Sequence, residues 1–331
     1  MRWFAVRSQP SGRLAFVLAV VACLTRGLVA QAAPAFEVPA WAFPMTPAGP
    51  APRRDPAALH AVPGSTMRYT LPQLTNLFQA PDWFPDSHPA MPGVVSQGRR
   101  PAVMACGFCH LPDGRGRPEN ASLAGLPAAY IVAQVHAMQG RERQSAAPAP
   151  FLPAAYMTIV ADGVSDDELA EAAAYFAALP LARRSRVVEL EEIPRGVAGV
   201  GLYFPGEGTE PLGQRLIEMA EDRHRHELRD PTLGYVTYVP PGSVARGAAV
   251  ARGGAASAMS ACTTCHGPAL RGMAPAPPLA GRSPSALLRQ LLAFRTGARA
   301  SAAAAPMRMV TAELSLADMI AVAAYAGSLE P

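Results

Sequence analysis

The sequence has no lysine, few cysteines and no charged tract, and its clearest apolar run is short. That run, residues 14–24, falls below the roughly 20 residues that a membrane-spanning helix needs. Half of the residues are apolar, which excludes a disordered chain, whereas 35 prolines and 28 glycines exclude regular structure over long stretches. Because 331 residues are enough for two or three domains, we expect compact lobes joined by irregular segments. We have no functional account of the missing lysine.

Residues 1–32 have the pattern of a secretory signal peptide. Three arginines precede the apolar run, and small residues ending in Ala30-Gln31-Ala32 follow it. We therefore predict cleavage after Ala32 and a periplasmic mature protein. A second interpretation stays open, in which the segment ending at Cys23 is a lipoprotein signal, and only lipid on Cys23 would predict membrane association.

The charge of the predicted mature chain is balanced. Residues 1–32 contain four arginines and no acidic residue, so their removal lowers the formal net charge from +4 to zero. A nucleic-acid partner is not indicated, because such proteins carry an excess of basic residues.

Four of the five cysteines lie in two CxxCH motifs, "CGFCH" at 106–110 and "CTTCH" at 262–266. CxxCH is the pattern of a c-type haem site: two thiols on one helical turn each add to a vinyl group of one haem, and the histidine reaches the iron. Structural zinc would not need a histidine after each pair, a thioredoxin-like dithiol would need a βαβ setting, and a CxxC disulfide closes a strained loop. Haem is therefore the favoured interpretation for Cys106, Cys109 and His110, and for Cys262, Cys265 and His266.

The two motifs belong to an internal repeat. The first cysteines are 156 positions apart, as are two Leu-Ala-Gly segments, 123–125 and 279–281, and Gly98 and Gly254. Helix-like runs at 130–138 and 287–294 follow, and further along the offset is 150 for Met157 and Met307, Ser165 and Ser315, and Tyr175 and Tyr325. The two serines, with acidic residues in the next turn, predict N-caps of alanine-rich terminal helices.

With these motifs, each module resembles a class I cytochrome c, and the pair resembles the dihaem cytochromes of the c-four type. The match covers residues 94–180 and 247–331. The resemblance implies a mainly α fold with two cytochrome c-like helical domains and two covalently bound haem c groups. It also implies that a glycine of the first helix packs on an aromatic residue of the last, pairing Gly98 with Tyr175 and Gly254 with Tyr325.

The residue opposite each histidine decides whether a haem carries electrons or reacts. Methionine is the usual ligand in the family that these modules resemble, and Met157 and Met307 alone fall at equivalent places, with Met138 and Met309 in reserve. His136 could instead form a bis-histidine site, although a partly buried, hydrogen-bonded helix residue is favoured. His224, His226 and Glu227 could bind a metal, although a solvated face is favoured. Four arginines after the middle helices could contact haem propionates or be plain surface charge: Arg141, Arg143, Arg295 and Arg299.

The remaining chain predicts two further parts. Residues 33–93 are proline-rich, and we expect an irregular arm laid over the first lobe through Trp41, Phe78, Trp83 and Phe84; a mobile tail and a docking surface stay open. Residues 181–246 form a linker, in which 186–240 alternate or cluster β-branched and aromatic residues and predict a small β insertion between the lobes.

The sequence thus predicts a periplasmic dihaem cytochrome c that relays single electrons from a dehydrogenase or other donor to an oxidase, another cytochrome or other acceptor. An electron carrier is favoured over an enzyme. Two alternatives remain: a dihaem redox enzyme of the peroxidase kind, with an open or histidine-ligated iron, and a cytochrome subunit of a dehydrogenase complex.

Overall fold

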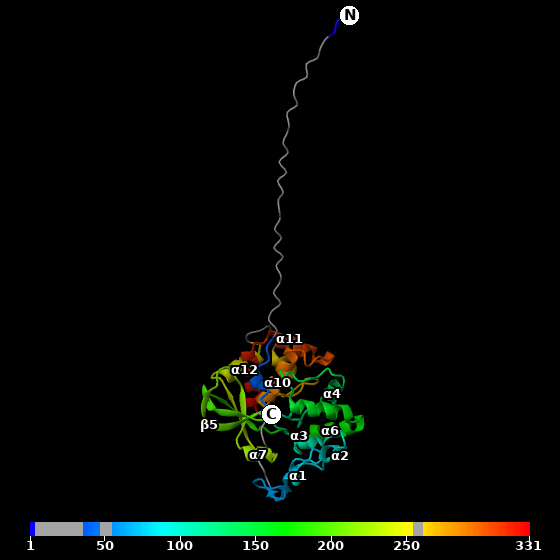
Figure 1. The fold of residues 1–331 in the computed structure, drawn as a ribbon, viewed down its shortest axis with the longest axis vertical. Coiled ribbons are helices and arrows are strands. Elements are labelled where there is room, and N and C mark those ends of the chain that lie inside the picture. The colour runs from blue at the N-terminus through cyan, green and yellow to red at the C-terminus, as the bar shows by residue number, and fades with distance from the viewer. Residues whose placement is uncertain (4–35, 47–54, 254–260) are drawn as a thin grey trace. The chain divides into compact units, whose positions relative to one another are not determined.

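The computed structural model describes residues 1–3, 36–46, 55–253 and 261–331 (Figure 1). The chain divides into two units, residues 1–35 and residues 36–331, and the account below concerns the second. The predicted cleavage site at Ala32, the lipidation alternative at Cys23, and Gly254 lie outside the described residues.

Each repeat folds as a set of helices in the same order. The first lobe, residues 94–180, contains most of α2 and all of α3 to α6. The second lobe, residues 247–331, contains most of α8 and all of α9 to α12. In chain order the helices of the first set are α2 (Gly93–Ser96), α3 (Cys106–His110), α4 (Ala128–Gln139), α5 (Leu152–Gly163) and α6 (Asp166–Ala178). Those of the second are α8 (Ser243–Ala251), α9 (Cys262–His266), α10 (Pro284–Arg295), α11 (Ala305–Glu313) and α12 (Leu316–Ser328). The middle and terminal helices confirm the sequence prediction, whereas α5 and α11 were not predicted.

The terminal helices begin at the predicted serines. Ser165 Oγ accepts a hydrogen bond from Glu168 N, and Ser315 Oγ accepts one from Asp318 N. The acidic side chains return the bond to the serine backbone N–H, so each helix starts with a complete capping box.

Of the two predicted contacts between the first and last helices, that of Gly254 with Tyr325 lies outside the described residues, and that of Gly98 with Tyr175 differs from the structure. A Cβ on Gly98 would meet the backbone of Val103 and Met104, not Tyr175. In the second lobe Gly247 takes the crossing position on α8, where an added Cβ would lie 2.0 Å from Ala321 O and 2.8 Å from Tyr325 Cβ. Only a residue without a side chain lets these two helices approach so closely.

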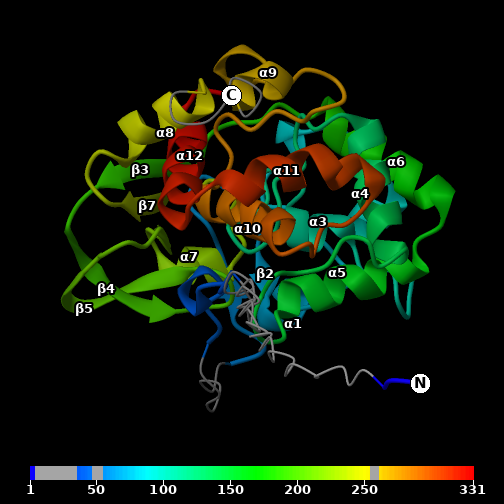
Figure 2. The ribbon, with the colours of Figure 1, turned by 90° about the horizontal axis from the view of Figure 1, so that it is seen from above.

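The predicted β insertion is confirmed as a five-stranded sheet. Its strands are β3 (Ser185–Glu189), β4 (Glu192–Ala198), β5 (Tyr203–Pro211), β6 (Ile217–Ala220) and β7 (Tyr235–Val239), in the order β3-β7-β6-β5-β4. β3 pairs in parallel with β7, β6 pairs antiparallel with β7 through Met219 and Val236, and the short helix α7 (Arg223–Glu227) lies between β6 and β7. Figure 2 shows α10 and α12 between this sheet and α4 and α6 of the first lobe.

The proline-rich segment is an arm with little regular structure, as predicted. Its described part contains η1 (Ala40–Ala42), β1 (Leu59–His60), β2 (Tyr69–Thr70), α1 (Leu71–Leu74) and η2 (Pro85–Ser87). Leu77 and Ala80 do contact the first lobe, where they pack with Phe108. Trp41 and Trp83 instead reach other parts: Trp41 O accepts a hydrogen bond from Tyr203 of the insertion, and Trp83 Nε1 donates 2.8 Å to Leu228 O. The arm therefore covers the insertion as well as the first lobe.

Taken singly, none of the described helices combines the length and the hydropathy that a bilayer crossing requires. One pair meets the test jointly, Ala302–Glu313 with Leu316–Ser328, and it is bent by 118°.

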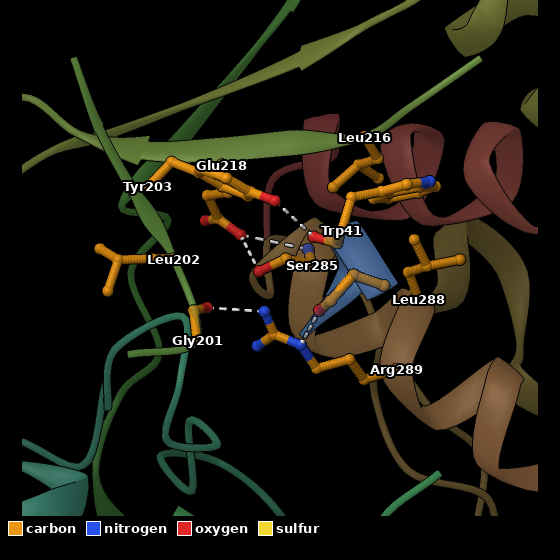
Figure 3. A pocket seen from close by; sticks show the side chains of 10 residues that line it. Trp41, Gly201, Leu202, Tyr203, Leu216, Glu218, Ser285, Leu288 and Arg289 are labelled. Atoms are coloured by element: carbon orange, nitrogen blue, oxygen red, sulfur yellow. Dashed lines mark hydrogen bonds between the residues drawn. The ribbon is translucent and has the colours of Figure 1, made fainter. Parts of the chain in front are cut away.

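One buried arginine joins four segments of the chain, and Figure 3 shows its hydrogen bond to Gly201. Arg289 projects from α10, and its guanidinium donates to Ala42 O of the arm, Pro118 O of the first lobe and Gly201 O of the insertion at 2.6–2.8 Å. Its carbon Cζ lies 5.6 Å and 5.5 Å from the ring centroids of Phe43 and Phe151. Burial lowers the pKa of Arg289 to about 10, so it stays charged at neutral pH.

Replacement of Arg289 should destabilise the whole unit. In Arg289→Ala three buried carbonyl oxygens lose a charged donor, and we expect a loss of about 3–5 kcal/mol in the free energy of unfolding, measured by chemical denaturation. Arg246→Ala removes an exposed ion pair with Asp318 and is the matched control, expected to cost less than about 1 kcal/mol. Equal losses of unfolding free energy in the two variants would contradict the conclusion that Arg289 joins the four segments.

Candidate haem sites

Each CxxCH motif forms a single helical turn at an equivalent place. On α3 and α9 the cysteines are three positions apart, so both thiols lie on one side of the turn. The chain leaves both helices with a positive φ, 64° at Leu111 and 76° at Gly267. This left-handed exit costs a leucine about 1 kcal/mol and a glycine almost nothing, and Leu111 is fully buried, so packing holds it there.

The motif histidines are oriented by backbone carbonyl groups. His110 Nδ1 lies 2.7 Å from Ala121 O, and His266 Nδ1 lies 2.8 Å from Pro277 O, eleven residues further along in each case. A carbonyl only accepts, so Nδ1 carries the proton and the lone pair is left on Nε2. Burial lowers the pKa of both histidines and favours this neutral form. Each motif histidine thus presents at Nε2 the nitrogen lone pair that a haem iron requires.

The loops after the two histidines repeat the same hydrogen bonds. Gly116 N donates to His110 O, and Gly272 N donates to His266 O. The Leu-Ala-Gly segments close each loop, because Gly125 N donates to Phe176 O and Gly281 N donates to Ala326 O near the end of the terminal helix. The repeat in sequence is therefore a repeat in backbone geometry.

None of the four motif cysteines is part of a disulfide. Burial, with a smaller contribution from Cys109, raises the pKa of Cys106 to about 12, and burial also raises the pKa of Cys109 and Cys262. Among the described residues no group of three or more His, Cys, Asp or Glu side chains could hold a metal ion. Paired thiols beside a histidine with a free Nε2 fit a covalently attached haem.

The candidate methionine ligands lie on the helix that precedes each terminal helix. Met157 is half-buried on α5 and packs against Val135, Ala161 and Leu169. Met307 is half-buried on α11, whereas Met309 of the same helix is 66% exposed. Met138 packs on the same cluster as Met157, but its position in the second lobe is Phe294.

Two of the four predicted arginines meet where the lobes join. Arg143 and Arg299 form an antiparallel β-bridge, and Gln144 N and Ala300 N each donate 2.7 Å to a backbone oxygen of the other lobe. Each guanidinium donates to the glutamine Oε1 of its own lobe and of the other, Gln134 and Gln290. Burial, and then the like charge of Arg299, lowers the pKa of Arg143 to about 10. No described carboxylate lies within ion-pair distance of either guanidinium.

Arg141 and Arg295 have other roles in the structure. Arg141 makes a two-point ion pair with Asp162, with both distances 2.8 Å, on the exposed surface. Arg295 donates to Thr311 O and Ala312 O at the end of α11. These two arginines are therefore engaged by protein groups.

The remaining histidines differ from the sequence expectation in their exposure. His136 is on the surface, with a side chain that is 48% exposed and 3.1 Å from Asp166 Oδ1, not partly buried. His226 is buried, not solvated: it lies 3.4 Å from Glu119 Oε1 and 3.2 Å from Tyr235 OH. No local pattern in the sequence predicts that this insertion residue packs against the first lobe, because the contact spans more than one hundred positions.

Comparisons with known proteins agree with these sites. Residues 250–330 match the cytochrome c family model. Cytochrome c4 of Azotobacter vinelandii is 27% identical over 244 residues, which cover 72% of this chain and 90% of that protein. Cytochrome c4 of Pseudomonas aeruginosa is 28% identical over 238 residues, which cover 70% and 87%.

The chain is similar to the dihaem class I c-type cytochromes of the c4 kind. The same similarity supports two covalently bound haem c groups. A solved thiosulfate dehydrogenase from Marichromatium purpuratum is 26% identical with a TM-score of 0.47, and the match covers 71% of the cytochrome and 39% of that chain.

The stability of the cytochrome should depend on Glu119 at low pH. Burial by itself would raise the pKa of this carboxyl, but Arg117 and His226 outweigh burial and lower it to about 2. A lowered pKa contributes stability above pH 4.5 that is lost as the pH falls toward 2. Relative to Glu119→Gln, the free energy of unfolding of the parent should fall by about 3 kcal/mol more across this window. The control Glu171→Gln, at an exposed residue, should show the same dependence of the free energy of unfolding on pH as the parent. If Glu119→Gln also shows the same pH dependence as the parent, the role assigned to Glu119 is refuted.

Proposed function

We propose that this cytochrome is a periplasmic carrier that relays single electrons from a dehydrogenase or other donor to an oxidase, another cytochrome or other acceptor. The relationship to cytochrome c4 supports electron transfer between redox proteins in general. The pattern of residues 1–32 supports export to the periplasm. The observation that carries the proposal is that both lobes have an oriented histidine in the CxxCH motif and a half-buried methionine on the helix before the terminal helix.

In this proposal each lobe supplies four residues to its haem. Cys106 and Cys109, and Cys262 and Cys265, would hold the haems, and the irons would be bound by His110 and Met157 in the first lobe and by His266 and Met307 in the second. Bound haem supplies reversible one-electron chemistry, and a thioether ligand favours the ferrous state. The protein fixes the orientation of each histidine through Ala121 O or Pro277 O and excludes water by burial. A closed iron on both faces carries electrons and does not react with peroxide.

The domain layout belongs to the proposal as well. It assigns residues 1–32 to the signal peptide, 33–93 to the arm, 94–180 and 247–331 to the two cytochrome domains, and 181–246 to the linker with the insertion. The repeated helix order and the repeated loop hydrogen bonds support the two cytochrome domains.

Arg143 and Arg299 are the arginines proposed to contact haem propionates. Two buried like charges without a described carboxylate are unfavourable alone, and propionates would neutralise them. Arg141 and Arg295 are less suited, since Asp162 and the α11 carbonyls already occupy them.

The methionine assignment is tested by single substitutions. In the ferric protein, Met157→Ala and Met307→Ala should each remove about half of the methionine-to-iron absorption band, because each opens one haem. Met309→Ala is the matched control and should leave the whole band. A full band in Met307→Ala, or rapid peroxide turnover by the parent, would reject the carrier and favour a dihaem enzyme.

The propionate assignment is tested by the reduction potential. Arg143→Gln and Arg299→Gln should each lower a haem midpoint potential, since a buried cation near the haem disfavours the more positive ferric state. Arg141→Gln, at the exposed ion pair, should leave both midpoints in spectroelectrochemical titration near the parent values. Equal shifts in all three variants would refute the assignment.

A further inference from the structure

The two haem attachment loops have the same backbone but different surroundings. In the first lobe Phe108 is 3% exposed, whereas Thr264, its equivalent 156 positions later, is exposed. Pro118 of the first loop is buried, whereas its equivalent Ala274 is exposed. The arm and the insertion cover the first loop, and no described residue of either covers these exposed positions of the second. The second loop therefore serves as an internal reference for the effect of the arm and the insertion on the first loop.

The insertion places an arginine directly on the first motif. Arg229 follows α7, and its Cζ lies 3.7 Å from the ring centroid of Phe108, the residue between the two cysteines and next to Cys109. Arg229 has a φ of 59°, an uncommon conformation for a residue with a side chain. Among the described residues its buried Nε has no hydrogen-bond partner, and no carboxylate lies within ion-pair distance. The fold thus holds a partly buried cation here, with its Nε fully buried, at a cost.

A second arginine and one glutamate complete a charged cluster at this place. Arg117 Nε lies 3.1 Å from Glu119 Oε1, and both side chains are at most 9% exposed. His226 and Tyr235 also line the cluster, and burial lowers the pKa of His226 more than Glu119 raises it. Two guanidinium groups and one carboxylate leave the cluster with a net positive charge.

The second loop has none of these charges. Arg117 corresponds to Met273, which is 53% exposed, and Glu119 corresponds to Pro275. Its one arginine, Arg271, is exposed to solvent, where water and salt screen a charge. The asymmetry between the lobes is therefore electrostatic as well as steric.

We propose that Arg229 of the insertion raises the reduction potential of the first-lobe haem, and only of that haem, by holding a partly buried positive charge against its attachment motif. Reduction adds one electron from the donor to ferric iron and lowers the charge of the haem by one. A nearby buried cation stabilises the reduced form relative to the oxidised form, and the low dielectric strengthens the effect. The inference deepens the proposed relay, because it makes the two sites unequal, and it depends on haem attachment but not on the methionine ligands.

The experiment is a spectroelectrochemical titration of the complete dihaem protein, fitted to two one-electron steps. Arg229→Gln should lower one midpoint and leave the other, and Glu119→Gln, which removes a buried negative charge, should raise the same midpoint. Arg229→Lys should restore most of the parent value, and Arg271→Gln, the matched control on the second loop, should move neither step. Haem methyl NMR signals, assigned by contacts to residues of each lobe, identify the step that responds.

Opposite shifts from Arg229→Gln and Glu119→Gln in the first-lobe step support the proposal. A purely structural role would shift both variants in the same direction, and that result, or equal shifts in both haems, overturns it. If Arg229→Gln does not fold with haem, Glu119→Gln and Arg229→Lys still show whether a positive charge at this cluster raises or lowers the first-lobe midpoint potential. Failure of the methionine ligation would appear separately, as a missing methionine-to-iron band in the parent before any titration.

Discussion

The structure depends on one buried guanidinium shared by four segments. Arg289 of α10 holds the backbone of the arm, the first haem loop and the insertion through three hydrogen bonds, and two aromatic rings exclude water around it. A charge taken out of water is costly, and only several well-placed acceptors compensate for that cost. The residue therefore requires the arm, both lobes and the insertion to be in place together, which is consistent with residues 36–331 forming one unit.

Within this unit the lobes follow one plan and differ in what surrounds it. The oriented histidine, the loop hydrogen bonds and the capped terminal helix occur twice with nearly constant spacing. The first motif lies beneath aromatic and charged residues of the arm and the insertion, whereas Cys265 of the second is exposed. Two copies of one module have thus acquired unequal environments, a basis for unequal potentials in a two-haem relay.

Arginine side chains make the long-range polar contacts that join the parts of the molecule. Arg282 links the lobes by donating to Ser122 O and Ala124 O, Arg143 and Arg299 meet across the interface, and Arg229 lies on Phe108. A planar guanidinium can donate to several carbonyls at once and stack on a ring, which an ammonium group cannot do equally well. Because the chain has no lysine, every buried cation in it is of this kind.

The sequence by itself determined the chemistry and the local structure: the haem motifs, the capped helices and the β character of the insertion all depend on residues a few positions apart, and the repeat shows that the same local pattern occurs twice. Tertiary structure alone decided which side chains meet across long separations. It placed Trp41 on the insertion, Gly247 at the crossing of α8 and α12, and His226 in the interior, and it separated Arg143 and Arg299 from Arg141 and Arg295. The physical reason is that spacing along a helix or a loop fixes local geometry, whereas burial and charge pairing depend on partners more than one hundred residues away, which no local pattern specifies.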